Sequence, residues 1–277
     1  MKTLFEKRLE FITPAFLCGA DQSKAELRPA SIRGQLRWWF RVLGGSRELE
    51  SARFGGVHGG TTASKIVVRA GQLDERHVPF SNPAPFTGKS YLLYFATVSG
   101  ARKGIRIEDQ AYFAPGTRFT LSVLERFPLD EAERSLLART LDAFVRLGAL
   151  GLRATRGCGA LAEETSPTPQ AFRKWCQECG VAVHLPPTAP YDSMDALMEY
   201  FGNALKQFRK DECKSGQSES SLGYSLGSAR QSSTLRLRPI RILENGQIRF
   251  IPAIVHIPST CKHPDPSPID VSRFPVC

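Results

Sequence analysis

The sequence predicts an α+β protein of two domains, and three observations lead to that prediction. The chain has 277 residues, which suits two domains of roughly 100–150 residues. Its first part shows the signals strand, helix, strand, strand, helix, strand, which is the split βαβ or ferredoxin-like order. A Thr-Ser-Pro-Thr-Pro linker at 165–169 then separates residues 1–165 from a smaller α+β domain at 166–277. Local propensity is also compatible with other α+β folds.

The elements of the first domain follow from local patterns. Residues 2–12 alternate roughly between apolar and polar side chains and predict the first strand. A helix begins near Ser31, a candidate N-cap, and ends at the glycine pair Gly44-Gly45. The second helix covers residues 130–147 and has Gly148 as its C′ residue. Further strands are expected at 65–70, 91–97 and 118–124, with a short one from residue 160.

The second domain is predicted from two helical stretches and one hairpin. The helices are expected at 170–179 and 193–211. Strands at 234–243 and 247–257 flank Asn245-Gly246, a strong signal for a type I′ turn. Irregular structure is expected at 74–90, at 214–221 and from residue 258 onward.

The first helix of the chain combines a core face with a cationic row. At about 100° per residue its apolar side chains form one narrow stripe, made of Ile32, Leu36, Trp39 and Leu43. Arg33, Arg37 and Arg41 recur every four residues beside that stripe, without an acidic partner three or four positions away within the helix. Trp38 falls beyond the arginines. Arginines for phosphates and an indole for bases suit single-stranded nucleic acid.

A solvated helix face is the alternative interpretation of this arginine row. Glu48 or Glu50 could fold back onto the arginines, and a tryptophan pair is usually part of a core. The composition favours the nucleic-acid interpretation, because the formal net charge is +10 and the pI is near 9.5. A basic excess of this size indicates a polyanionic partner, although a protein bound to a membrane surface could look similar.

Residues 148–159 form a second basic segment, in which Arg153 and Arg156 lie among glycines. Glycines let backbone N–H groups approach a phosphate, and the arginines add positive charge. A flexible connector between helix and strand is the alternative. The Walker A and GxGxxG patterns are absent from the sequence, so we expect no nucleotide cofactor, and no other cofactor is indicated.

Two long segments carry a family resemblance: FITPAFLCGADQ at 11–22 and ELRPASIRGQLRWWFR at 26–41. Both resemble the first-numbered RAMP subunits of the type III-B CRISPR (Cmr) effector complex. Shorter matches to the same pattern lie at 54–55, 115–119, 151–159 and 225–237. The resemblance covers the first domain well and the second domain thinly.

The resemblance implies two ferredoxin-like, RRM-related domains in tandem, the second smaller and more divergent. It implies a non-catalytic subunit that holds the 3′ region of the guide RNA at one end of an antiviral complex, beside other RAMP subunits and near target RNA. Target cleavage belongs to a different subunit in that family. The RNA-binding residues carried over to this chain are Arg33, Arg37, Trp38, Arg41, Arg153 and Arg156.

Three alternatives remain open from the residues themselves. His58, in a glycine-rich loop, could serve as the acid or base of a metal-independent endoribonuclease that trims guide RNA. The protein could instead be a capping scaffold without intrinsic RNA affinity. Zinc could bind a set formed by Cys176, Cys179, Cys213, Cys261 and His263, but the second close-spaced pair of a zinc ribbon is missing, so no metal site is predicted.

The location expected for the chain is the cytoplasm, without membrane contact. No apolar run approaches the ~20 residues of a membrane-spanning helix. The first eight residues, MKTLFEKR, also lack an apolar signal segment. The seven cysteines are therefore expected to be thiols rather than disulfides.

Overall fold

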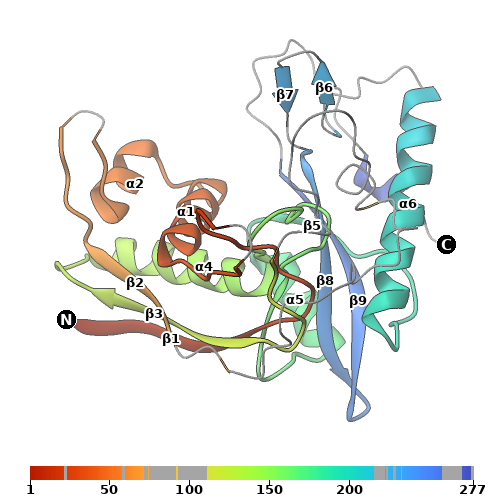
Figure 1. The fold of residues 1–277 in the computed structure, drawn as a ribbon, viewed down its shortest axis with the longest axis horizontal. Coiled ribbons are helices and arrows are strands. Elements are labelled where there is room, and N and C mark those ends of the chain that lie inside the picture. Colours follow the sequence, from red (N-terminus) through yellow and green to blue (C-terminus); the bar gives the residue numbers. More distant parts are fainter. Residues whose placement is uncertain are drawn as a thin grey trace. The chain divides into compact units, whose positions relative to one another are not determined.

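A computed structural model of the chain describes two compact units, each with its own antiparallel sheet (Figure 1). Unit 1 contains the described residues from 1 to 74, from 111 to 152 and from 158 to 166. Unit 2 contains residue 92, residues 153–157 and the described residues from 167 on. The class is α+β, as predicted. The described residues are 1–21, 24–57, 60–71, 74, 92, 111–214, 222, 224–226, 229–231, 233–257 and 270–275.

Unit 1 is a four-stranded antiparallel sheet with helices on one face (Figure 1). Its strands are β1 (Lys2–Phe11), β2 (Ile66–Gly71), β3 (Arg118–Glu125) and β4 (Leu161–Glu163), in the order β2-β3-β1-β4. Its helices are α1 (Pro29–Val42), α2 (Arg47–Phe54) and α4 (Glu131–Leu147). The chain order is the predicted one, with α2 added between α1 and β2.

The N-cap of helix α1 lies three residues before the predicted one. Arg28 is the N-cap and Pro29 opens the first turn, where its missing N–H is harmless. The expectation that Ser31 caps the helix is therefore wrong. The predicted end is confirmed: Gly44 has φ +94°, its N–H donates to the Arg41 carbonyl, and the Gly45 N–H donates to the Phe40 carbonyl. This pair of bonds is a Schellman motif, which needs the left-handed conformation that glycine adopts easily.

Helix α4 is fixed by a capping box at its start. Asp130 accepts a hydrogen bond from the Glu133 N–H, and the Glu133 side chain accepts one from the Asp130 N–H. Its end differs from the expectation for Gly148, which has φ −74° and is extended rather than left-handed. The core of unit 1 lies between the sheet and the helices and includes Leu9, Phe11, Ile32, Trp39, Phe119, Leu121, Leu141 and Phe144.

Unit 2 contains a three-stranded sheet in the order β5-β9-β8 and a separate β6-β7 pair. The long hairpin is confirmed, with Asn245 at φ +50° and Gly246 at φ +76° in the turn. A second ferredoxin-like arrangement stays a prediction. The elements are α5 (Pro169–Glu178), β5 (Ala182–His184), α6 (Met194–Lys214), β6 (Tyr224–Leu226), β7 (Ala229–Gln231), β8 (Leu235–Glu244), β9 (Gln247–His256) and the 3₁₀ helix η3 (Val271–Arg273).

Several expectations lie outside the described residues. They are the strand at 91–97 apart from Leu92, nearly all of the 74–90 insertion, most of 214–221 and most of the segment from residue 258 onward. None of the helices in the part of the chain that the structure describes is both long and apolar enough to span a membrane.

Candidate nucleic-acid interface

The three surfaces predicted for α1 are present in the structure. Ile32, Leu36 and Trp39 are fully buried, joined by Phe40 rather than by Leu43. Of the arginines, Arg33 and Arg37 are partly exposed and Arg41 is exposed. Trp38 is partly exposed, and its ring meets that of Trp39 edge-on, with 5.0 Å between ring centroids. One face of α1 therefore packs in the core while its cationic row reaches the surface.

Two of the three arginines are engaged by one buried carboxylate, as the alternative interpretation allowed. Glu50 accepts a hydrogen bond from Arg37 Nε at 2.5 Å and another from Arg41 Nη1 at 2.6 Å. The partner comes from α2, which the sequence interpretation did not include. The row has no acidic partner within α1, as the sequence indicates, but Arg37 and Arg41 are paired with a residue of the next helix. Their predicted contact with RNA stays a prediction.

The two arginines lower the pKa of Glu50 although the carboxyl group is buried. Burial alone would raise the pKa of this carboxyl group, which is only 4% exposed. The hydrogen bonds and charges of Arg41 and Arg37 outweigh burial, so the pKa lies below its ordinary value. Glu50 is therefore charged at neutral pH and neutralises part of the arginine row.

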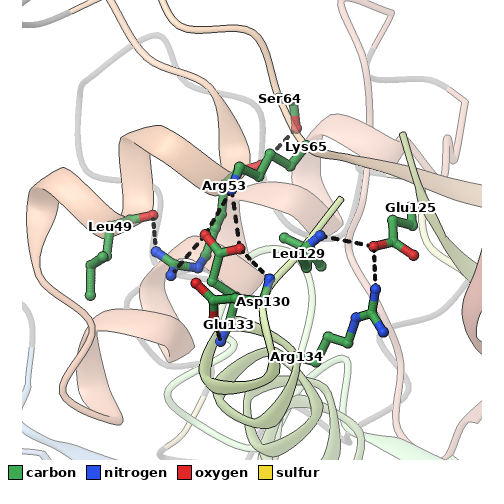
Figure 2. A network of polar contacts seen from close by, with 9 residues as sticks. All are labelled: Leu49, Arg53, Ser64, Lys65, Glu125, Leu129, Asp130, Glu133 and Arg134. Carbon is green, nitrogen blue, oxygen red and sulfur yellow. Dashed lines mark hydrogen bonds and ion pairs between the residues drawn. The ribbon is translucent and has the colours of Figure 1, made fainter. Parts of the chain in front are cut away.

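Helix α2 is held in place by a second, more deeply buried network (Figure 2). Arg53, on the last turn of α2, donates to the Leu49 carbonyl and reaches Glu133 at the start of α4 with a 3.0 Å contact. Lys65, just before β2, contacts the same Glu133 carboxylate at 2.9 Å. The network fastens α2 to both α4 and β2, which sets the position of Glu50 over α1.

Arg33 is the arginine of the row that is not tied to Glu50. It makes no ion pair or side-chain hydrogen bond with any other residue in the described ranges. Partial burial, and then the charge of Arg37, lower its pKa below the ordinary value of an arginine. A guanidinium that is partly desolvated and lacks a counter-charge is a favourable site for an anion.

An open pocket of about 540 Å³ lies around Arg33 in unit 1. Arg37 and Arg126 also line it, together with Ser51, Thr61, Thr62 and Ser64. No acidic residue is among its described lining residues. Gly55 closes one side at φ +77°, and a Cβ there would lie 3.3 Å from Arg33 Nη2. Three arginines, hydroxyl groups and a small residue make a pocket suited to a phosphate group.

The glycines of the 148–159 loop serve close backbone packing. A Cβ at Gly151 would lie 2.5 Å from the Phe16 carbonyl oxygen, and one at Gly159 would lie 1.9 Å from the Leu150 carbonyl oxygen. The Gly159 N–H donates to the Pro14 carbonyl. These two glycines pack both ends of the loop closely against unit 1, and the Gly159 N–H is already engaged by a carbonyl.

The two loop arginines belong to unit 2. Arg153 has φ +59°, and the N–H of Arg156 donates to its carbonyl in a tight turn. Arg156 bridges to Leu237 of β8, and the buried Arg238 of β8 donates to the Ala154 carbonyl. The segment 153–157 is therefore bound to the second sheet. That Arg153 and Arg156 bind the same RNA as α1 stays a prediction.

The catalytic and metal alternatives fall largely outside the described residues. His58 is one such residue, as are Cys261 and His263 of the possible zinc set. Cys179 Sγ contacts the backbone carbonyls of Cys176 and Val181. Across the described ranges, no three His, Cys, Asp or Glu side chains are grouped as a metal site would require.

Comparisons with known proteins agree with the architecture. The family model of the RAMP superfamily matches residues 8–162. The chain is 30% identical over 176 residues to CRISPR system Cmr subunit Cmr1-2 of Pyrococcus furiosus, covering 55% of this chain and 91% of that protein. It is 30% identical over 175 residues to Cmr1-1 of the same organism, covering 56% of this chain and 46% of that protein.

Two solved structures are similar over nearly the whole chain. The crystal structure of apo Cmr1 from Pyrococcus furiosus gives a TM-score of 0.59 at 20% identity, covering 94% of this chain and 89% of that one. A chain in the cryo-EM structure of type III-B Cmr-beta bound to cognate target RNA gives 0.58 at 11% identity, covering 93% and 94%. At these identities the likeness shows the fold alone.

Proposed function

The chain belongs to the RAMP superfamily and is homologous to Cmr1 subunits, and from that premise we propose that it is a non-catalytic RNA-binding subunit of a type III-B CRISPR effector complex. It holds the 3′ region of the guide RNA at one end of the assembly, beside other RAMP subunits and near the target RNA. The tandem ferredoxin-like arrangement and a cytoplasmic location belong to the same proposal.

The observation that carries the proposal is the arginine pocket of unit 1. Arg33 and Arg126 line it without a counter-charge among the described residues, while the chain as a whole carries a formal charge of +10. A positive pocket on a basic protein is the footprint expected for a polyanion. Arg37 also lines the pocket, and Arg41 and Trp38 add further RNA contacts from α1 in the same proposal. Arg153 and Arg156 are proposed to contact RNA from unit 2.

Substitution of Arg33 is expected to lower the affinity for RNA and also to make that affinity less dependent on salt concentration. Each phosphate contact to a single strand contributes roughly 0.7 to the slope of log affinity against log salt. Arg33→Gln should lower the slope by about that amount. The measurement is the affinity of the full chain for single-stranded RNA across salt concentrations. Arg139→Gln, at an exposed position of α4, removes the same charge and should leave the slope unchanged.

Equal slopes for wild type and Arg33→Gln would remove the pocket from the RNA-binding surface. Failure of the wild-type chain to bind single-stranded RNA at any salt concentration would contradict the proposed function itself and favour the capping scaffold.

Cleavage of RNA by the chain is not expected. The residues assigned to the site are arginines and a tryptophan, which bind phosphates and bases but do not supply a nucleophile or a proton carrier near neutral pH. End-labelled single-stranded RNA should stay intact with the purified protein, with or without Mg²⁺ or Mn²⁺. Discrete products that appear with wild type and vanish with His58→Ala would establish the endoribonuclease instead.

A further inference from the structure

An exposed aromatic side chain lies directly beside the arginine pocket. Phe127 follows Arg126 after β3, and 43% of its surface is exposed. The guanidinium carbon of Arg126 lies 5.2 Å from the centroid of the Phe127 ring. Arg126 thus connects the pocket, which it lines, with a flat apolar surface outside the core.

The backbone holds this pair in a fixed place. The N–H groups of Arg126 and Phe127 both donate to the Lys65 carbonyl, at 2.7 and 3.1 Å. Lys65 is itself bound to Glu133 through its side chain and to Arg53 through its backbone N–H. The pair therefore stands on the same buried network that positions α2, so little backbone ordering is left for a ligand to induce.

The chemistry of the pocket selects an anion with an attached flat group. Glu50 occupies Arg37, which leaves Arg33 and Arg126 as the lining arginines without a counter-charge among the described residues. Guanidinium groups bind phosphate oxygens in a bidentate manner. An aromatic ring stacks any base, and an arginine beside it adds a cation–π contribution.

Resting on the proposed function, we propose that this pocket and Phe127 form a subsite for one nucleotide of single-stranded RNA. Arg33 and Arg126 hold its phosphate, and Phe127 stacks its base. The volume of about 540 Å³ lies within the usual range for small-ligand sites. Recognition at this subsite is independent of sequence, because stacking and phosphate contacts do not read base edges.

The test measures binding of the full chain to fluorescently labelled oligouridine and oligoadenosine across salt concentrations. Phe127→Ala should weaken binding to both RNAs by roughly 5- to 150-fold and leave the salt slope unchanged. Arg126→Gln should weaken binding and lower the slope by about 0.7. Ile248→Ala, an exposed apolar position of unit 2, and Arg139→Gln are the matched controls. Thermal unfolding of each variant checks that it remains folded.

Four outcomes separate the possibilities. The subsite is supported if Phe127→Ala lowers affinity alone, Arg126→Gln lowers both affinity and salt slope, and the two control variants bind as wild type does. Tight RNA binding by wild type that neither variant changes overturns the subsite and leaves the proposed function standing. Absence of RNA binding by wild type overturns both. In the last outcome, Arg126→Gln binds both RNA and polyglutamate more weakly, while Phe127→Ala binds both as wild type does. That result overturns the nucleotide subsite and indicates that the pocket binds an acidic protein segment.

Discussion

Replacement of Glu133 with glutamine is expected to destabilise the protein by about 3–5 kcal/mol, because it leaves a buried arginine without its counter-charge. Glu133 and Arg53 are each 5% exposed, and their 3.0 Å contact lies at the junction of α2, α4 and β2. Lys65 also depends on this carboxylate. Chemical unfolding of the full chain measures the loss in the free energy of unfolding.

Glu131→Gln is the matched control for this substitution. Glu131 lies in the first turn of the same helix and is exposed, and its substitution also replaces a carboxylate with an amide. We expect its effect to stay within about 0.5 kcal/mol. Equal losses for the two variants would mean that the charge at the start of α4, rather than the buried contact with Arg53, stabilises the structure.

The pH dependence of stability gives a second readout of the same network. Burial would raise the pKa of Glu133, but Lys65, the Asp130 N–H and Arg53 outweigh it and hold the pKa below the ordinary value of 4.5. A carboxyl group with a lowered folded pKa stabilises the fold fully above the unfolded pKa. That contribution is lost as pH falls below about 4.5. The free energy of unfolding should therefore fall less steeply with decreasing pH in Glu133→Gln than in wild type.

Trp39→Ala is expected to destabilise the protein by roughly 3–5 kcal/mol, whereas Trp38→Ala is not. Trp39 is fully buried in the core of unit 1, so its removal leaves a large cavity. Trp38 is partly exposed, and its truncation removes an edge contact with Trp39 that is worth about 0.5–1.5 kcal/mol, without leaving a buried cavity of that size. If Trp38 stacks a base, its truncation should cost about 1–3 kcal/mol of RNA affinity.

Two measurements on the two single variants separate these roles. Unfolding by urea reports the loss of packing, and RNA affinity at a temperature where both variants are folded reports stacking. A loss of stability for Trp38→Ala as large as that for Trp39→Ala would place both indoles in the core.

The parts of the fold that were predicted from sequence depend on contacts between near neighbours. The glycine pair that ends α1 and the Asn245-Gly246 turn are each encoded within a few residues. Helix α2 was missed because it has only eight residues and no long apolar repeat, although Ser46 and two acidic residues of the first turn are local start signals. Short helices depend on tertiary packing, here the contact between Arg53 and Glu133.

The composition of the candidate site was less predictable than the helix that carries it. The arginine spacing located Arg33, but whether an arginine is engaged depends on residues from other elements. Glu50 and Arg126 come from α2 and the end of β3, and only folding brings them to α1. Helical angle correctly separated Trp39 from Trp38, because that distinction needs only the geometry of one helix.

Because Glu50 holds Arg37 through Nε and Arg41 through Nη1, an incoming anion must either share these guanidinium groups through their other N–H groups or displace the carboxylate. The resident carboxylate is tethered, and tethered groups compete at effective concentrations in the millimolar range. A single small anion must compete with the Glu50 carboxylate through its own contacts with Arg37 and Arg41. A polymer already held at Arg33 delivers its next phosphate with a comparable effective concentration. Under the proposed function, Glu50 would therefore favour binding of polyanions over single ions at Arg37 and Arg41, before any base has been recognised.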